Sequence, residues 1–188
     1  MNGTATNPKL GLHIGGKEPK EGWLILDAIP GNHVDIVGDA ANLSDFADGY
    51  FNSIYASHVL EHFDYVDKLL ATLVEWKRVI RPGGLAMISV PDLKTLCSLM
   101  LDTESLQPQE RFMVMRMMFG GHINKYDYHL AGLNDEFLAS YLHRAGFVNI
   151  QRVNSFGLFR DTSEMVFKGR KISLNVLAQK PSTDEHQN

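Results

Sequence analysis

The 188-residue sequence has little cysteine and no long hydrophobic run, and each absence excludes a class of protein. Its one cysteine, Cys97, cannot form a disulfide within the chain, which indicates a reducing compartment and predicts a cytoplasmic protein. No apolar stretch approaches the ~18 residues that span a bilayer, and the start of the chain lacks the pattern of a secretory signal. We therefore expect neither a membrane segment nor a disulfide scaffold.

A strong excess of one charge is also missing. The 18 Lys and Arg side chains face 22 Asp and Glu, and the net charge of −4 has no block of like sign. This balance disfavours nucleic acid as a partner, because nucleic-acid binding needs a basic surface. The length predicts one domain with its own core. We place this domain at residues 9–180, between polar tails at 1–8 and 181–188 that we expect to be disordered.

Short apolar runs separated by polar turns are the main pattern of this domain. Such runs are typical of strands covered on both faces of a parallel sheet. We predict strands at 10–14, 23–26, 34–37, 51–56 and 85–90, followed by an antiparallel pair at 147–153 and 172–179. Helices are predicted from Asp64, the expected cap, to Pro82-Gly83-Gly84, over 112–119 against the sheet, and over 134–145 before Gly146. The alternation predicts an α/β fold.

The connection between the first two strands is unusually short. Only residues 17–22 lie between their ends, whereas a helical crossover needs a dozen or more residues. A hairpin and a parallel pair joined by extended chain are both compatible with this length. Residues 15–22 can reach about 26–29 Å, which exceeds the ~17 Å of a five-residue strand. The sequence leaves both arrangements open.

Glycine and acidic residues gather where the predicted strands end. Ligands of open α/β sheets bind beyond these carboxyl ends. Glycine lets a ligand approach the backbone, and a carboxylate accepts hydrogen bonds from ribose hydroxyls. These positions are Gly15-Gly16, Asp27, Gly38-Asp39, Ser57-His58 and Pro91-Asp92. Both G-x-x-x-x-G-K-[ST] and G-x-G-x-x-G are absent, which disfavours a phosphate-binding loop and a nicotinamide-dependent enzyme and favours a nucleoside without phosphates.

Three segments carry a resemblance to a known family. Residues 12–16 and 22–27 (LHIGG…GWLILD) are similar to the "LNLGSG…GWINLD" opening of small class I S-adenosylmethionine-dependent methyltransferases. Residues 56–62 (ASHVLEH) are similar to their "S-x-V-L-E-H" segment. Residues 76–93 (WKRVIRPGGLAMISVPDL) are similar to "RVLKPGG-L-x-I-S-V-P-D-L". The resemblance extends over residues 9–93 and continues more weakly through 134–180.

The resemblance implies a fold and a function. The fold is α/β and Rossmann-like, with a mostly parallel seven-stranded sheet, an antiparallel strand at one edge, helices on both faces and a shortened first crossover. The implied enzyme transfers a methyl group from S-adenosylmethionine to an oxygen or nitrogen of a small-molecule or sugar-like acceptor. A non-catalytic module that binds S-adenosylmethionine or S-adenosylhomocysteine and acts as a partner or regulator stays open as the alternative.

The resemblance also implies a cofactor site. In it, Asp27 accepts the ribose hydroxyls, Asp39 lies by the adenine, and Ser57 lies on the sulfonium side. The full set is Ile14, Gly15, Gly16, Asp27, Ala28, Asp39, Ala40, Ala56, Ser57 and His58. The family's usual third glycine is not present in residues 13–18.

Residues 119–132 (FGGHINKYDYHLAG) form a polar and aromatic cluster with glycines at both ends and no helical or strand period. In this fold such a segment covers the substrate; the plainer interpretation is an irregular surface loop. We predict His129 as a general base, because a histidine accepts a proton near neutral pH. Tyr126 is expected to orient the substrate, and His58 is a competing base. The Met-rich stretch 112–119 is a candidate wall of the acceptor pocket.

The motif H-V-L-E-H contains two histidines one helical turn apart, His58 and His62. The zinc-protease order H-E-x-x-H is not present, so the motif alone predicts no metal site. Glu61 and His62 are expected to support the sheet edge near the cofactor.

Overall fold

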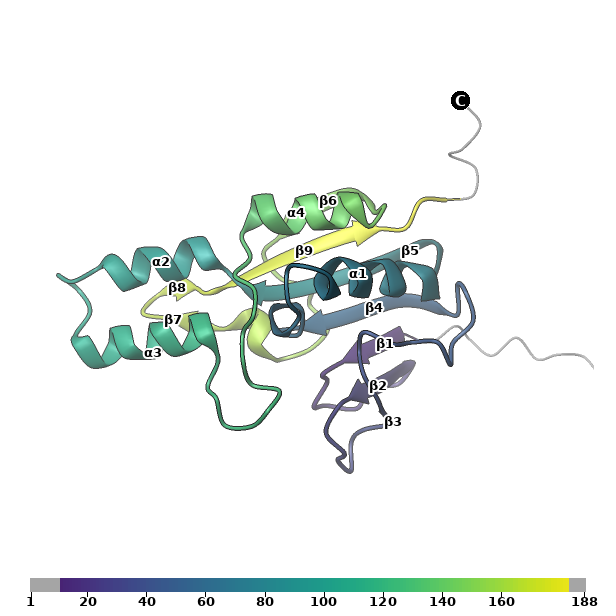
Figure 1. Ribbon diagram of the computed structural model, residues 1–188, viewed down its shortest axis with the longest axis horizontal. Helices are drawn as coiled ribbons and strands as arrows, with labels where there is room; N and C mark the ends of the chain where they lie inside the picture. The colour runs from purple at the N-terminus through teal and green to yellow at the C-terminus, as the bar shows by residue number, and fades with distance from the viewer. Residues whose placement is uncertain (1–10, 183–188) are drawn as a thin grey trace, which may run out of the picture.

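The computed structural model describes residues 11–182, so the predicted N-terminal tail and residues 183–188 of the predicted C-terminal tail lie outside the described residues. Seven strands form one sheet in the order β3-β2-β1-β4-β5-β9-β6 (Figure 1). Their bounds are β1 Gly11–Ile14, β2 Trp23–Asp27, β3 Ile36–Val37, β4 Phe51–Ser57, β5 Ile80–Pro91, β6 Val148–Val153 and β9 Ser173–Gln179. The short strands β7 (Val166–Phe167) and β8 (Arg170–Lys171) form a separate hairpin.

The sheet is parallel except for one strand. β1 to β5 pair in parallel with one another, whereas β9 is antiparallel to both of its neighbours, β5 and β6. The antiparallel strand therefore lies one position in from the β6 edge. This arrangement confirms the predicted mostly parallel, seven-stranded, Rossmann-like sheet.

The first crossover is a parallel return through extended chain. β1 and β2 pair from Gly11↔Trp23 to Ile14↔Leu26, and no helix lies between them. The backbone turns at Gly15 and Gly22, which have φ of +72° and +79°. This conformation is accessible to glycine because it has no Cβ. Of the two arrangements left open by the sequence, the structure has the parallel one.

Helix α1 (Lys68–Val79) covers the centre of the sheet. It buries Leu69, Leu73 and Trp76 against the strands. The prediction that Asp64 caps this helix is wrong, because Asp67 is the N-cap. The Asp64 carboxylate instead accepts hydrogen bonds from the backbone N–H groups of Val66 and Asp67, at 3.1 and 3.0 Å, in the turn before the helix. The helix ends before the Pro-Gly-Gly segment because the backbone is already extended at residue 80, where β5 begins.

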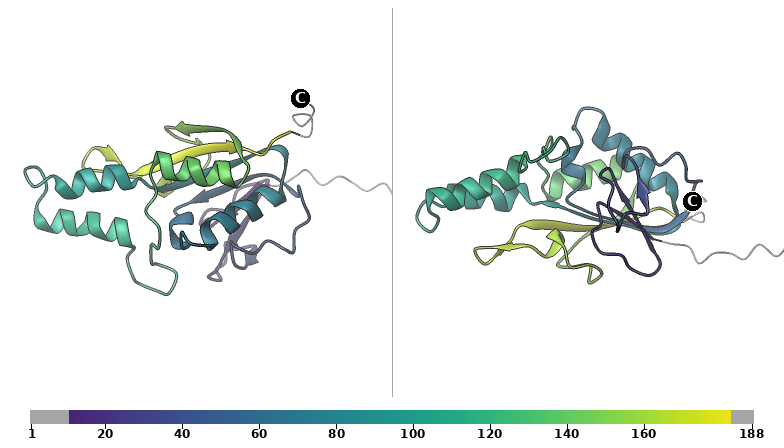
Figure 2. Two further views of the ribbon diagram at one scale, coloured as in Figure 1. Left: turned by 45° about the horizontal axis from the view of Figure 1, so that its top comes forward. Right: turned by 90° about the horizontal axis from the view of Figure 1, so that it is seen from below.

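Helix α4 (Asp135–Arg144) packs beside α1 on the same face of the sheet, as both views of Figure 2 show. Its N-cap is Asn134, whose side chain accepts from the N–H of Phe137 at 2.9 Å. Gly146 follows its end with φ of +84°. The predicted helix at 134–145 and its glycine stop are therefore confirmed.

The opposite face is covered by a loop. Phe159 packs there against Tyr55 and His13, with ring centroids 4.7 and 4.0 Å apart. The loop continues into η2 (Thr162–Glu164), a single 3₁₀ turn. The prediction of helices on both faces is confirmed for the face that α1 and α4 cover. On the opposite face, among the described residues, only the 3₁₀ turn η2 is helical, because the first two crossovers are too short to form a helix. A second 3₁₀ turn, η1 (Leu60–His62), follows β4.

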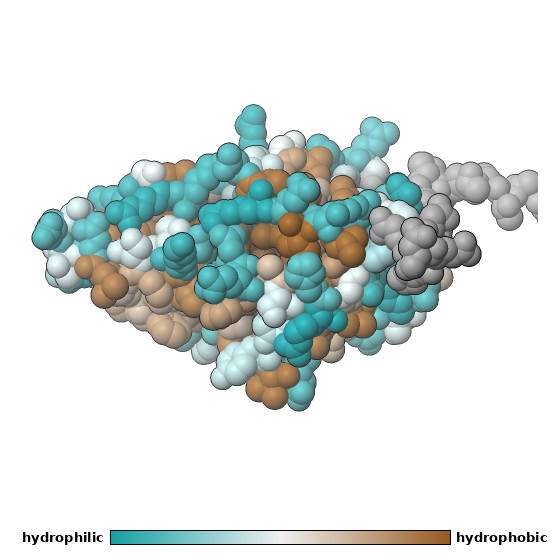
Figure 3. All heavy atoms as spheres, turned by 90° about the horizontal axis from the view of Figure 1, so that it is seen from above, coloured by the Kyte–Doolittle hydropathy of each residue, from teal (hydrophilic) through white to brown (hydrophobic). Residues whose placement is uncertain are grey.

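Two helices, α2 (Leu93–Leu101) and α3 (Pro108–Phe119), form a hairpin at one end of the molecule (Figure 1). No pattern in the sequence predicted α2, and the prediction that 112–119 packs on the sheet is wrong. α3 packs mainly on α2, in a small cluster that includes Leu96 and Val114. Figure 3 shows hydrophobic surface beside hydrophilic side chains at this left-hand end. Within residues 11–182, each helix is too short or too polar to be a candidate for crossing a bilayer.

Candidate functional site

A cleft of about 1170 Å³ opens at the carboxyl ends of β1 to β4. It is lined by most of the residues that the sequence singles out. These are Ile14, Gly15, Asp27, Ala28, Asp39, Ala40, Ser57, His58 and Tyr126. The structure brings them together because the strands are parallel, so their carboxyl ends meet at one edge. The strand register places Ile14 opposite both Leu26 and Ala56.

Three of the predicted residues do not line the cleft: Gly16, Ala56 and His129. Ala56 is 1% exposed, within the core of β4. A Cβ on Gly16 would lie 2.6 Å from the His13 ring, so this glycine makes room for a buried histidine. Burial lowers the pKa of that histidine to about 4.

Asp27 ends β2 with its carboxylate in the cleft wall. One oxygen accepts from the N–H of Ile29 at 2.9 Å, and the other pairs with the Lys17 ammonium at 2.7 Å. The Asp27 side chain is 11% exposed and that of Lys17 is 70% exposed, so the lysine can move away while the acid stays in place. A carboxylate with free lone pairs at a strand end fits a ribose diol. Lys17 is not among the site residues predicted from the sequence.

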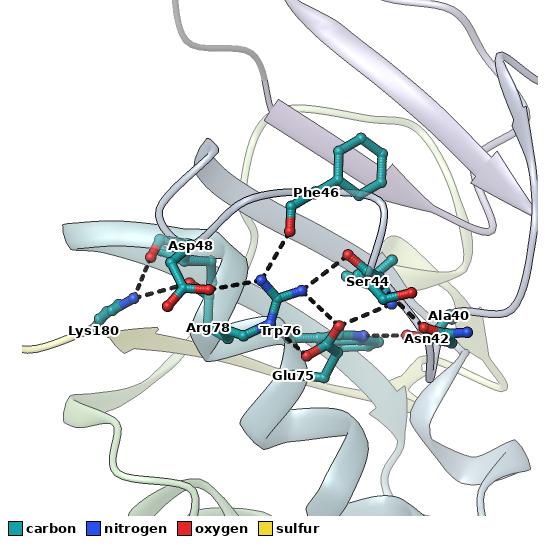
Figure 4. A network of polar contacts seen from close by, with 11 residues as sticks. Ala40, Asn42, Ser44, Phe46, Asp48, Glu75, Trp76, Arg78 and Lys180 are labelled. Carbon is teal, nitrogen blue, oxygen red and sulfur yellow. Dashed lines mark hydrogen bonds and ion pairs between the residues drawn. The ribbon is translucent and has the colours of Figure 1, made fainter.

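Asp39 lies at the start of the loop between β3 and β4, and its carboxylate accepts from the N–H of Ala41 at 2.9 Å. Figure 4 shows the polar network that fixes this loop to α1. The indole N–H of Trp76 donates to the carbonyl of Ala40 at 2.8 Å. Trp76 is fully buried, so this bond holds the cleft-lining backbone at a defined position.

Arg78 is the centre of the same network. Its guanidinium donates to the carbonyls of Phe46 and Leu43 at 2.8 and 3.0 Å and to both carboxylate oxygens of Glu75 at 2.8 Å. The hydrogen bond from Arg78 lowers the pKa of Glu75. Glu75 in turn accepts from the N–H of Leu43 at 3.0 Å. No residue pattern predicted this network, because Arg78 reaches the carbonyls of Phe46 and Leu43 only through the fold, across 32 and 35 residues of the chain.

The segment 119–132 forms the opposite wall of the cleft, and its residues 123–128 line it. Gly120 has φ of +91°, and a Cβ there would collide with the carbonyl oxygen of Asp127. The end of the segment is tied down, because the N–H groups of Leu130 and Ala131 donate to the carbonyl of Glu61 at 2.7 and 3.1 Å. Tyr126 is 44% exposed and faces the cleft.

The two histidines that were predicted as bases have different positions. His58 lines the cleft, and its Nε2 lies 2.9 Å from Ser173 Oγ. The His129 side chain is 10% exposed and lies behind the cleft wall, with Nε2 3.9 Å from Glu61 Oε1. Burial lowers the pKa of both histidines to about 4, which leaves both rings neutral at pH 7. Their catalytic roles stay predictions.

Glu61 is 1% exposed, and burial raises its pKa to about 8. Among the described residues, neither of its carboxylate oxygens has a hydrogen-bond partner. One ligand atom each from Glu61, His62 and His129 lies within 4.8 Å of the others. The structure thus assembles a histidine–glutamate cluster that the motif at 58–62 did not reveal by itself.

The mostly parallel sheet, with acidic residues and glycine at its strand ends, defines a Rossmann-like protein whose cleft lies where such sheets bind their ligands. Residues 18–88 match the family model described as a methyltransferase domain. With the fold, this match shows that the chain is similar to the class I S-adenosylmethionine-dependent methyltransferases. The resemblance identified in the sequence, and S-adenosylmethionine as the cofactor of that family, are confirmed.

Solved structures with the same fold share little sequence with this chain. A possible exported protein from Bordetella parapertussis is 14% identical with a TM-score of 0.57; the match covers 93% of this chain and 63% of that protein. An S-adenosylmethionine-dependent methyltransferase from Archaeoglobus fulgidus is 17% identical with a TM-score of 0.58, covering 92% and 86%. A 1,6-didemethyltoxoflavin-N1-methyltransferase from Burkholderia thailandensis, bound to S-adenosylhomocysteine, is 16% identical with a TM-score of 0.55, covering 93% and 72%.

This chain therefore spans less than two thirds of the Bordetella protein. No curated protein matches the sequence.

Proposed function

We propose that this protein is an enzyme that transfers the methyl group of S-adenosylmethionine to an oxygen or nitrogen of a small-molecule or sugar-like acceptor. The observation that carries this proposal is the cleft, where Asp27 and Asp39 face the segment 123–128. Its volume of about 1170 Å³ exceeds the ~300–1,000 Å³ of a typical small-molecule site. The cleft therefore has room for a nucleoside cofactor and a small acceptor together.

The donor half of the cleft fits the cofactor by its chemistry. Asp27 would accept both ribose hydroxyls once Lys17 moves aside, and the Asp39 turn would lie by the adenine. Gly15 would lie against the methionine part, where its missing side chain allows close approach. Ser57 and His58 would lie on the sulfonium side, because Ser57 ends β4, the strand next to β1, and His58 follows it.

The acceptor half of the cleft would mainly hold the acceptor in line with the methyl group. Methyl transfer is an in-line displacement, in which the bond from the acceptor to carbon forms as the carbon–sulfur bond breaks. Alignment of the two and exclusion of water are the main contributions that a protein makes. Tyr126 would orient the acceptor from the cleft wall. His58 or His129, both neutral at pH 7, would take a proton where the acceptor must lose one. Cys97 is free and exposed, which fits a reducing compartment, so we place the protein in the cytoplasm.

Calorimetric titration tests the cofactor. We expect S-adenosylhomocysteine to bind with one site per chain and NAD not to bind, because within residues 11–182 no helix begins at a glycine-rich loop that could hold a pyrophosphate. Binding of NAD in place of S-adenosylhomocysteine would contradict the proposal.

Turnover separates an enzyme from a binding module. Candidate acceptors, including sugars and small hydroxyl or amine compounds, are screened for release of S-adenosylhomocysteine from S-adenosylmethionine. Tight cofactor binding without turnover on any acceptor class would favour the non-catalytic module.

A further inference from the structure

The wall of the cleft contains a group of metal-ligating side chains from three parts of the chain. Glu61 and His62 belong to η1, His58 directly follows β4, and His129 comes from the segment 119–132. His58 Nδ1 and His129 Nε2 lie 3.8 and 3.9 Å from the same oxygen, Glu61 Oε1. Glu61 is 1% exposed, and among residues 11–182 neither of its carboxylate oxygens has a hydrogen-bond partner. A buried carboxyl group without a hydrogen-bond partner is costly, and a bound cation would supply the partner that Glu61 lacks.

The hydrogen bonds around the cluster direct lone pairs toward its centre. Ser173 Oγ donates to the carbonyl of Thr162 at 2.6 Å, so it must accept from His58 Nε2–H at 2.9 Å. The other nitrogen of His58, Nδ1, therefore has the lone pair and faces Glu61. No hydrogen bond joins this lone pair to Glu61 Oε1, which lies 3.8 Å away.

His62 is oriented in the same way. Its Nδ1 lies 3.1 Å from the carbonyl oxygen of Tyr128, which can only accept a hydrogen bond. The proton is therefore on Nδ1, and Nε2 is free to bind a metal. A ligating histidine whose other N–H donates to a backbone carbonyl is the usual outer-shell arrangement of metal sites.

From this geometry we infer that Glu61, His62 and His129 bind a divalent transition-metal ion, with the His58 Nδ1 lone pair directed at the same point. One ligand atom of each lies within 4.8 Å of the others. Metal bonds of about 2.0–2.2 Å place tetrahedral ligands roughly 3.3 Å apart, so ligand atoms up to 4.8 Å apart must approach one another by about 1.5 Å or less when the ion binds. Two imidazoles and one carboxylate are the ligand set of several zinc enzymes and of non-haem iron, and they do not favour Mg²⁺ or Ca²⁺.

The position of the cluster gives the ion a role in the cleft. His58 and His62 line the cleft, so an ion between them and Glu61 keeps a coordination position open toward it. The consequence for chemistry rests on the proposed methyl transfer. An acceptor hydroxyl bound to the ion loses its proton to water more easily; its oxygen then bonds to the methyl carbon as the carbon–sulfur bond breaks, which leaves a methyl ether and a thioether. The site thus favours oxygen acceptors. With the ion bound, His129 is a ligand and not the general base, and the acceptor proton goes to water.

Metal binding to the untagged full-length chain tests the inference without any acceptor. Co²⁺ is titrated and followed by its visible absorption, and Zn²⁺ is then added as a competitor. We expect one Co²⁺ per chain, displaced by one Zn²⁺. The variants Glu61→Gln and His62→Ala should each weaken Co²⁺ binding by about 100-fold or more, since even outer-shell changes cost 10–100-fold.

The matched control is His143→Ala, which removes an exposed histidine of α4 and should bind Co²⁺ as the wild type does. Glu61→Gln keeps the shape of the buried side chain, and circular dichroism reports on its fold. If this variant unfolds, His62→Ala, at a partly exposed position, decides the result. A wild-type chain that binds neither Co²⁺ nor Zn²⁺, or equal loss in His143→Ala, would overturn the inference. Titration of S-adenosylhomocysteine into the same proteins tests the proposed function separately.

Discussion

The Arg78 network gives a prediction that links a distant side chain to the cofactor cleft. Replacing Arg78 by Met keeps much of the apolar stem and removes the guanidinium that donates to the carbonyls of Phe46 and Leu43 (Figure 4). A hydrogen bond to a charged group contributes ~1.5–3 kcal/mol. The Arg78 side chain is 29% exposed, and water can replace part of what is lost. We therefore expect a loss of about 2–3 kcal/mol of unfolding free energy.

Two assays measure this effect. For a chain of this size, 1 kcal/mol corresponds to ~2–4 °C in Tm, so Arg78→Met should melt about 4–12 °C lower. The loop at 39–50 should also leave its binding conformation part of the time. If that conformation falls to roughly a third to a tenth of the population, the Kd for S-adenosylhomocysteine rises about 3- to 10-fold.

The matched control is Arg111→Met on α3, where no side-chain hydrogen bond ties the arginine to the cleft loops. An unchanged Tm and an unchanged Kd in Arg78→Met would refute the reasoning, because the loop would then be held without its guanidinium. A lower Tm with an unchanged Kd would refute only the link to the cofactor.

Three further predictions concern pH, a glycine and a histidine. Arg78 lowers the pKa of Glu75 in the folded protein. The stability that this pair contributes is therefore fully present above the unfolded pKa of Glu75 and is lost as the pH falls through the lower, folded pKa. Because Arg78→Met lacks this pair, its Tm should drop less than that of the wild type between about pH 6 and 3. Gly120→Ala should weaken S-adenosylhomocysteine binding in calorimetry, because its Cβ collides with Asp127, whereas Gly157→Ala has open space; equal effects would count against the collision. His129→Ala should lower turnover by about 10²–10⁴-fold and leave S-adenosylhomocysteine affinity nearly unchanged, and full activity would eliminate His129 from catalysis.

Much of the sheet could be predicted from the sequence, because strands buried on both faces appear as short apolar runs with clear ends. The strand ends at Asp27 and His58 also predicted where the cleft lies. The length of the first connection could not distinguish a hairpin from a parallel return. That choice depends on pairing in the sheet, which local residues do not determine.

The parts that the sequence did not predict depend on contacts between distant segments. α2 was missed because its apolar residues pack on α3 rather than on the sheet, and α3 was placed wrongly for the same reason. The motif at 58–62 predicted no metal site, because the third ligand that we infer, His129, is far away in the chain. Only the fold of the segment 119–132 brings this histidine to Glu61.

The most direct test of the cofactor site is the affinity of S-adenosylhomocysteine for Asp27→Ala, measured by calorimetry. The loss of hydrogen bonds to a charged group should cost ~1.5–3 kcal/mol, which corresponds to a Kd about 10- to 150-fold higher. Asp45→Ala, at an exposed position in the loop at 39–50, should bind as the wild type does. An unchanged Kd in Asp27→Ala, with the fold intact by circular dichroism, would contradict the account.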